Sequence, residues 1–228
     1  AERLQHKLEA KLEGADQSML VRSVATIVAQ VQAMKQLVNE FRDYARLPAA
    51  KLEALDLNAL VGEVLALYAG SQDSGHLVTD CASALPRIMG DATQLRQVIH
   101  NLVQNGLDAV ADRADGRVLI TTEVARTEQG EPRLVRLKVI DNGHGFADKV
   151  LKRAFEPYVT TKAKGTGLGL AVVKKIADEH GARVRLANLG ERSGEAGDGG
   201  AQVSLSFSKL APVESDPPAA VPAGERAH

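Results

Sequence analysis

The sequence predicts an α+β fold, a two-layer sandwich of helices on a mostly antiparallel sheet, preceded by a helical hairpin. Between Leu20 and Ala45 the apolar residues recur in alternating steps of four and three, which is the heptad spacing of a helix that pairs with other helices. Further along, stretches of helical period alternate with short β-branched stretches. These stretches lack the regular βαβ order of a doubly wound parallel sheet, so we expect a helical domain followed by an α+β domain.

Residues 1–47 are expected to form the hairpin. Leucines share one face of a short first helix, Gly14 interrupts it, and the heptad seam follows on a longer second helix. One hairpin alone buries little apolar surface, so we expect a homodimer through residues 1–47 in a four-helix bundle. The alternative is a helical arm packed on its own domain.

Pro48 ends the second helix and begins a linker over residues 48–57. In the α+β domain, residues 58–208, apolar residues spaced three or four apart indicate the helices. Alternating apolar and polar residues indicate the strands. The proline-rich tail, residues 209–228, is expected to be disordered. The expected elements are a helix over 58–68, a strand over 76–82, a helix over 91–111 capped by Asp91, strands over 117–126 and 133–141, a helix from Thr166, and strands over 182–189 and 201–208.

Composition excludes a general affinity for polyanions. The 228 residues include 28 basic and 29 acidic side chains, for a net charge of -1, so any anion site has to be local. The single cysteine, Cys81, has no disulfide partner within the chain, which favours a reduced, cytoplasmic setting. No apolar run in the sequence approaches the length of about 18 residues that a membrane span needs.

The helix that begins after Asp91 carries a stripe of amide side chains opposite its apolar face. Within it, Asn101 and Asn105 lie one turn apart and point the same way. Their amide oxygens suit a hard ion such as Mg²⁺, which keeps waters and phosphates as its other ligands. The alternative is a solvated helix face.

The segment "VIDNGHGF" ends a strand at Asp141 and enters a turn with Gly143 and Gly145. The glycines allow positive φ and a close approach to a ligand, while the aspartate can accept a hydrogen bond from an exocyclic amine. An ordinary hairpin turn is the alternative.

The segment "KAKGTGLGLAVVKK" begins a helix with almost bare backbone, because Gly165, Gly167 and Gly169 carry no side chains. The free amides and the positive end of the helix dipole form an anion cradle. Lys162 and Lys164 just upstream add positive charge for a terminal phosphate. A flexible loop is the alternative for this run alone, but the three segments together are the parts of a nucleotide site.

Four segments, "NLVQNGLDA" (101–109), "DNGHGF" (141–146), "FEPYVTTK" (155–162) and "GTGLGL" (165–170), resemble the N, G1, F and G2 boxes of sensor histidine kinases in the right order. The run "VAQVQAMKQLVNEFRDYARLP" is most similar to nitrogen-regulation sensor kinases of the NtrY type. The resemblance reaches Phe207. It implies the Bergerat ATP-binding (GHKL) fold, shared with gyrase and MutL-type ATPases, with residues 1–47 as the dimerisation and phosphotransfer domain.

The resemblance also implies roles for single residues. Asn105 would bind Mg²⁺, Asn101 would contact the phosphates or ribose of ATP, and Asp141 would bind the adenine amine beside Gly143 and Gly145. The remaining implied contacts are a mobile lid with Phe155, Lys162 and Lys164, phosphate-binding amides at Gly165, Thr166, Gly167, Leu168 and Gly169, and a hydroxyl of Ser204 at the adenine.

Two departures from the family pattern stand out. No histidine lies in the H-E-x-x-N-P context of a phosphoacceptor, and His76, His180 and His228 show no partner in the sequence. We therefore expect the phosphoacceptor to lie upstream of Ala1, so that this chain binds Mg-ATP but cannot phosphorylate itself. Position 108, basic in other subfamilies, is Asp108 here, which puts a phosphate contact there in doubt.

The function that the resemblance implies is that of the kinase core of a two-component sensor. Such a protein moves the γ-phosphate of ATP to a histidine and then to an aspartate of a response regulator, here in nitrogen-related signalling, and its parent is anchored in the bacterial inner membrane. An anti-sigma type serine kinase on the same fold is one alternative, which the heptad hairpin disfavours. A non-catalytic dimeric interaction module is the other, which the intact Asn105 and Asp141 disfavour.

Overall fold

The structure is a computed structural model that describes residues 14–160, 165–190 and 199–212, together with Arg3, Leu12 and Lys162. The first arm of the expected hairpin and most of the expected tail lie outside these residues. The helices are α2 (Gly14–Ala45), α3 (Leu57–Leu65), the 3-10 helix η2 (Ala66–Tyr68), α4 (Ala69–Asp73), α5 (Ala92–Ala109), α6 (Asp148–Leu151) and α7 (Gly169–Glu179). The strands are β1 (Glu53–Leu55), β2 (Leu77–Cys81), β3 (Ile88–Gly90), β4 (Val118–Arg126), β5 (Pro132–Asp141), β6 (Arg183–Asn188) and β7 (Ala201–Phe207).

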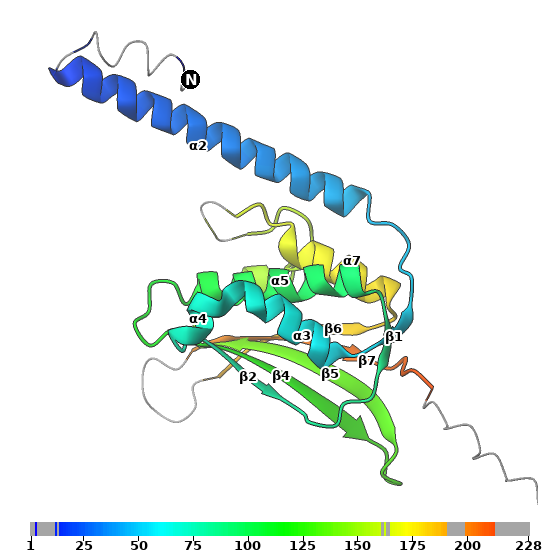
Figure 1. The fold of residues 1–228 in the computed structure, drawn as a ribbon. Coiled ribbons are helices and arrows are strands. Elements are labelled where there is room, and N and C mark those ends of the chain that lie inside the picture. Colours follow the sequence, from blue (N-terminus) through cyan, green and yellow to red (C-terminus); the bar gives the residue numbers. More distant parts are fainter. Residues whose placement is uncertain are drawn as a thin grey trace, which may run out of the picture.

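The main sheet has five strands in the order β2-β4-β5-β7-β6. Strands β2 and β4 are parallel, and every other neighbouring pair is antiparallel. Helices α3, α4, α5 and α7 all cover one face of this sheet, and the other face stays open (Figure 1). The two-layer α+β sandwich expected from the sequence is therefore confirmed.

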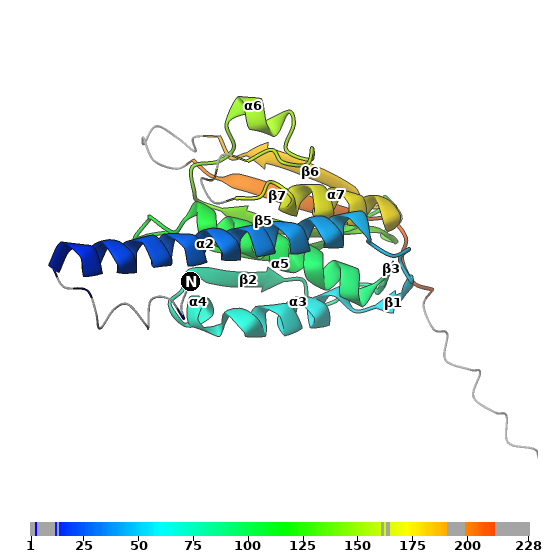
Figure 2. The same cartoon turned by 90° about the horizontal axis from the view of Figure 1, so that it is seen from above.

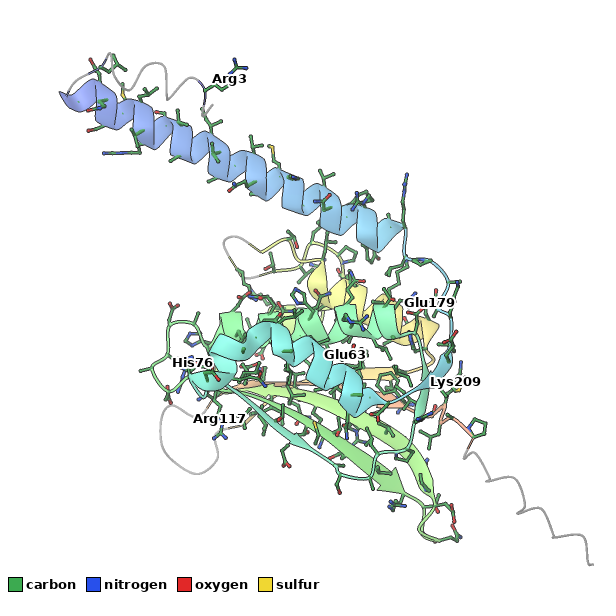
Figure 3. All side chains as sticks on the ribbon, in the orientation of Figure 1. Arg3, Glu63, His76, Arg117, Glu179 and Lys209 are labelled. Atoms are coloured by element: carbon green, nitrogen blue, oxygen red, sulfur yellow. The ribbon has the colours of Figure 1, made fainter. Side chains whose placement is uncertain are left out.

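Helix α5 lies at the centre of the helical layer. Its apolar face, including Val98 and Ile99, is completely buried in the core. Gly106 brings the helix close to the sheet, because a Cβ at this position would lie 3.0 Å from a methyl group of Val118. On the outer side, Arg96 meets Glu63 of α3, labelled in Figure 3, at 2.7 Å. Burial on one side and polar contacts on the other thus fix which face of α5 looks outward.

The segment that we interpreted as a linker is partly built into the α+β domain. Residues 53–55 form β1, which pairs antiparallel with β3. The carbonyl of Pro48 accepts a hydrogen bond from Gln94 Nε2 at 2.8 Å, and the N–H of Lys51 donates to Asp91 Oδ2 at 3.0 Å. The expected linker is therefore attached to the start of α5 from Pro48 onward.

Helix α2 runs across the helical layer (Figures 1 and 2). Its expected seam is mostly exposed, with Ile27 at 52%, Val31 at 59% and Met34 at 68%. The end of α2 meets α7 through Lys175, whose Nζ donates to the carbonyl of Tyr44 at 2.8 Å and lies 5.1 Å from the centre of its ring. No helix among the described residues is long and apolar enough to cross a membrane.

His180, for which the sequence shows no partner, ties α7 to α5. Its ring is 2% exposed, and its Nε2 accepts a hydrogen bond from the backbone N–H of Asp91 at 2.9 Å. The other ring nitrogen lies 2.8 Å from the carbonyl of Ile176, so this nitrogen is the donor of the ring. His180 is thus a structural residue that joins the end of one site-bearing helix to the start of the other.

Replacing the expected helix cap, Asp91, by alanine should cost about 1 kcal/mol of stability. Asp91 Oδ1 accepts hydrogen bonds from the N–H groups of Thr93 and Gln94. Burial alone would raise the pKa of Asp91, but these donors and the N–H of Lys51 outweigh it and hold the pKa below the ordinary 3.8. A lowered pKa means that the ionised carboxylate stabilises the fold above pH 3.8 and that this stabilisation is lost as the pH falls through the lowered value.

Urea unfolding of the Asp91→Ala protein and the unaltered protein measures this cost. The difference in free energy of unfolding should be full at neutral pH and should shrink below pH 3.8. Asp73→Ala, which alters an exposed aspartate of α4, is the matched control. Equal stability of the Asp91→Ala and Asp73→Ala proteins at neutral pH would contradict the capping role.

Candidate functional site

A cleft of about 460 Å³ opens between α5, the turn after β5 and the segment that leads into α7. This volume lies within the range of about 300 to 1,000 Å³ that small-molecule sites occupy. Most of the residues predicted from the sequence meet here, although they come from parts of the chain far apart. The predicted residues that line the cleft are Asn101, Asn105, Asp141, Gly145, Lys162, Gly165, Thr166, Gly167 and Gly169.

Not every predicted residue lines the cleft. Gly143 and Leu168 do not line the cleft. The N–H of Gly143 instead donates a hydrogen bond to Asp141, and Leu168 is 1% exposed and packs inward. Phe155 does not line the cleft either, so its part in a lid stays a prediction. Lys164 lies outside the described residues.

The structure contradicts the adenine contact predicted for Ser204. On β7 this residue pairs with Lys138 of β5 and does not line the cleft, whereas its neighbour Val203 does. Successive strand residues point to opposite faces of a sheet, so the hydroxyl faces away from the cleft. The residue of β7 that pairs with Asp141 and lines the cleft is Ala201, which has no hydroxyl.

Asp141 stands at one end of the cleft, at the last position of β5, and is 9% exposed. Its Oδ1 accepts a hydrogen bond from the N–H of Gly143 at 2.9 Å, and the N–H of Ala201 donates to the same carboxyl group. Burial raises the pKa of Asp141, an effect that these two N–H groups oppose. A carboxylate oriented by backbone amides and turned into a cleft is a fixed acceptor for a ligand N–H.

The turn after Asp141 is held by two asparagines that sequence reasoning missed. Asn188 Oδ1 accepts from the N–H of Phe146 at 2.7 Å, and its Nδ2 donates to the Phe146 carbonyl at 2.8 Å. Asn142 Oδ1 accepts from the N–H of Arg117 at 2.7 Å. Gly145 has φ 70°, which a β-carbon disfavours. The turn that carries His144 and Phe146 to the cleft is therefore fixed at both ends.

The wall of the cleft between its two ends is apolar where the sheet forms it. Val139 and Val203 line it and are 3% and 7% exposed. They project from the same face of neighbouring strands, because Val139 and Val203 pair directly. A flat apolar wall beside a fixed carboxylate suits an aromatic ring that carries an amine. Sequence reasoning did not identify these valines, because their place in the cleft depends on the pairing of β5 with β7.

The opposite end of the cleft is the glycine-rich start of α7. Gly167 has φ 71°, and its carbonyl accepts a hydrogen bond from the N–H of Tyr158 at 3.0 Å. Helix α7 then begins at Gly169, later than the expected Thr166, and no side chain caps its first turn. Gly165, Gly167 and Gly169 line the cleft at this uncapped helix start, so this end can bind an anion.

Asn105 and Lys162 meet beside this anion-binding end. Lys162 Nζ donates to Asn105 Oδ1 at 3.0 Å and to Asp108 Oδ2 at 2.7 Å. The amide oxygen of Asn105 thus already accepts from a cationic group, which fits the ligand expected for Mg²⁺. Across the described part of the chain no three His, Cys, Asp or Glu side chains gather as a metal site. A divalent cation here would therefore depend on Asn105 and on the phosphates of a ligand.

Comparisons with known proteins agree with this geometry. Residues 90–211 match the family described as "Histidine kinase-, DNA gyrase B-, and HSP90-like ATPase". The chain is 30% identical over 199 residues to the nitrogen regulation protein NtrY of Azorhizobium caulinodans, a match that covers 85% of this chain and 25% of that protein.

Solved structures of histidine kinases are also similar to the chain. Full-length ShkA in complex with AMPPNP is 28% identical with a TM-score of 0.63, over 91% of this chain and 42% of that one. The nucleotide-free catalytic domain of histidine kinase ThkA is 28% identical with a TM-score of 0.57, over 70% of this chain and 96% of that one. The chain spans only 25% to 30% of the length of curated relatives such as NtrY.

Proposed function

This chain belongs to the family of histidine kinase-, DNA gyrase B- and HSP90-like ATPases, and from that premise we propose that it is the Mg-ATP-binding core of a sensor histidine kinase. The observation that carries the proposal is that one cleft combines a fixed carboxylate with an anion-binding helix start. A buried carboxylate held by two backbone amides, Asp141, lies at one end, and the bare glycine start of α7 lies at the other. An adenine amine and a triphosphate require these two ends.

The proposed contacts follow from the geometry. Asp141 accepts from the exocyclic amine of adenine, while the ring lies against Val139 and Val203. Asn101 lines the cleft one turn before Asn105 on α5 and is proposed to contact ribose or phosphate. The amides from Gly167 to Gly169 at the start of α7 are proposed to bind the phosphates, whereas the N–H of Gly165 donates to the Lys162 carbonyl.

Catalysis in this proposal depends on positioning and on charge neutralisation, with no covalent step on this domain. Mg²⁺ held by Asn105 would spread the negative charge of the phosphates. Lys162 adds a mobile positive charge, and the fixed amides of α7 hold the triphosphate so that its terminal phosphate faces the acceptor. The acceptor is proposed to be a histidine on the dimerisation helices of the parent protein, and the final acceptor an aspartate of a response regulator.

The proposal extends to the parent protein. The exposed seam of α2, including Val31 and Met34, supports a homodimer through the helices of residues 1–47. Similarity to NtrY of Azorhizobium caulinodans supports a role in nitrogen-related signalling. We place this domain in the cytoplasm, attached to a parent anchored in the bacterial inner membrane.

Calorimetric titration with ATP, with and without Mg²⁺, tests the proposed function. The unaltered chain should bind ATP, and Mg²⁺ should tighten binding. Asn105→Ala should weaken binding about tenfold in Mg²⁺, as the loss of one charge-assisted contact worth about 1.4 kcal/mol. Without Mg²⁺ the loss should be smaller, because the amide oxygen then has only Lys162 as a cationic partner.

Gln97→Ala is the matched control for this titration. Gln97 is an amide on the same helix but lies outside the cleft, so its removal should leave ATP affinity within about twofold of the unaltered chain. No ATP binding by the unaltered chain, or equal Mg²⁺ dependence in the Asn105→Ala and Gln97→Ala proteins, would overturn the proposal.

A further inference from the structure

An acidic side chain stands where the cleft is expected to receive a triphosphate. Asp108 lines the cleft on the same face of α5 as Asn105, one turn further along. A carboxylate there would repel phosphates unless its charge is balanced. The structure supplies the balance through Lys162, whose Nζ lies 2.7 Å from Asp108 Oδ2.

Both members of this ion pair are held in place by other groups. The second oxygen of Asp108 accepts a hydrogen bond from Gln104 Nε2 at 2.8 Å. The N–H of Lys162 donates to Thr160 Oγ1 at 3.1 Å, and the N–H of Gly165 donates to the Lys162 carbonyl at 3.1 Å. These two hydrogen bonds hold the backbone of Lys162 next to α5.

The ammonium of Lys162 serves more than one acceptor. It also donates to Asn105 Oδ1 at 3.0 Å, and its charge reaches Asp141 at the far end, where it helps to lower the pKa of that carboxyl. The side chains of Lys162 and Asp108 are 38% and 41% exposed, so water screens the pair and it can separate at small cost. An exposed lysine beside a phosphate site can therefore change partners when a stronger anion arrives.

We propose that Asp108 sets the affinity of the cleft for triphosphates by holding Lys162 on Asn105 until the phosphates of ATP take the ammonium over. This inference rests on the proposed function. Binding of ATP then exchanges one ion pair for another, and it frees the amide oxygen of Asn105 for a cation. Asp108 acts against nucleotide binding, although it lines the cleft.

Calorimetric titration of the Asp108→Asn protein with ATP and with adenosine tests the exchange. Asparagine keeps the size and an accepting oxygen but lacks the negative charge that makes an ion pair with the ammonium. ATP affinity should rise about twofold to fivefold, the range expected when an exposed ion pair no longer has to be broken. Adenosine affinity should stay the same, because a ligand without phosphates leaves the pair intact.

Asp112→Asn is the matched control for charge. Asp112 lines the same rim of the cleft and is exposed, so this variant removes one negative charge without touching the pair. A gain in ATP affinity equal to that of Asp108→Asn would show plain repulsion and overturn the exchange. A loss of Mg²⁺-dependent affinity in Asp108→Asn would identify Asp108 as a metal ligand and would also overturn it.

A double variant separates exchange from repulsion a second time. In a Lys162→Gln background the ammonium is gone, so Asp108→Asn should improve ATP affinity only by relieving repulsion, and by less than it does with Lys162 present. A gain of the same size in both backgrounds contradicts the proposal. If the unaltered chain binds no nucleotide, the proposed function fails and this inference with it. If it binds ATP and Asp108→Asn does not differ, only the exchange fails.

Discussion

Replacing Asp141 by asparagine is expected to weaken ATP binding by about 3 kcal/mol, or about a hundredfold. Asparagine has nearly the same size, but one carboxylate oxygen becomes an NH₂ group. Because the N–H groups of Gly143 and Ala201 already point at this side chain, the new NH₂ meets either a backbone donor or the adenine amine. In both orientations a donor faces a donor, and an acceptor for the ligand is lost.

Titration calorimetry with ATP measures this effect, and thermal unfolding shows whether the fold is intact. The matched control is Ser204→Ala, which removes a polar group from the same sheet but on the face turned away from the cleft. We expect unchanged ATP affinity for this control. An Asp141→Asn protein that binds ATP as tightly as the unaltered chain would show that no adenine amine is recognised at Asp141.

The same residue predicts how binding depends on pH. Burial raises the pKa of Asp141 above the ordinary 3.8, so its proton competes with the adenine amine at a higher pH than an exposed aspartate would allow. ATP affinity should fall as the pH falls through this raised pKa, and the Asp141→Asn protein should lack this change. A pH series of titrations measures it. The same ATP pH dependence in both proteins would assign it to another group.

Protonation of Asp141 should affect stability in the opposite direction. Because the pKa is raised in the folded state, the fold binds this proton more tightly than the unfolded chain does. The stability from the neutral carboxyl is present at low pH and is lost as the pH rises through the raised pKa. Acid therefore weakens binding at this residue without weakening the fold through it, which separates a binding effect from unfolding.

Local chemistry in the sequence was sufficient to predict α5 and most of the cleft. The cap at Asp91 and the amide stripe with Asn101 and Asn105 depend only on helical period, and the structure has both. The start of α7 was predicted at Thr166 but lies at Gly169. The positive φ of Gly167 holds the preceding residues out of the helix, and no helical period reveals that.

The error at Ser204 was avoidable, because β7 alternates between apolar and polar residues. Its apolar residues, among them Val203, face the helices, so the serine between them has to face outward. The contacts of Asn188 with Phe146 and of Lys162 with Asp108 were not predictable in this way. These contacts join residues that are 42 and 54 positions apart in the sequence. Helical or strand periodicity contains no information on pairs at that separation.

Replacing Gly167 by alanine is the second change with a large expected effect. A Cβ at this position would lie 2.6 Å from the carbonyl carbon of Tyr158 and 2.7 Å from the backbone N of Val159. Both atoms belong to the main chain and cannot rotate away. The φ of 71° at Gly167 adds a cost of about 1 to 2 kcal/mol for any residue with a β-carbon. The contact between Tyr158 and Gly167 must therefore open.

Opening this contact moves the amides that are proposed to bind the phosphates. ATP affinity should fall by about 3 kcal/mol, or about a hundredfold, as when a preorganised anion donor is lost. Adenosine affinity should change little, because Asp141 and the apolar wall lie at the other end of the cleft. Titration of the Gly167→Ala protein with both ligands measures this difference.

Gly130→Ala separates the cost of backbone strain from the loss of the site. Gly130 has φ 86°, but nothing lies within 4 Å of a Cβ placed there, and it belongs to the turn between β4 and β5. This control should lose about 1 kcal/mol of stability and keep its ATP affinity. If Gly167→Ala lowers stability by no more than Gly130→Ala and leaves ATP affinity unchanged, the close contact at Tyr158 has no part in ordering the phosphate end. If both ligands bind equally poorly, the two ends of the cleft are not independent, and Gly167 orders the whole cleft.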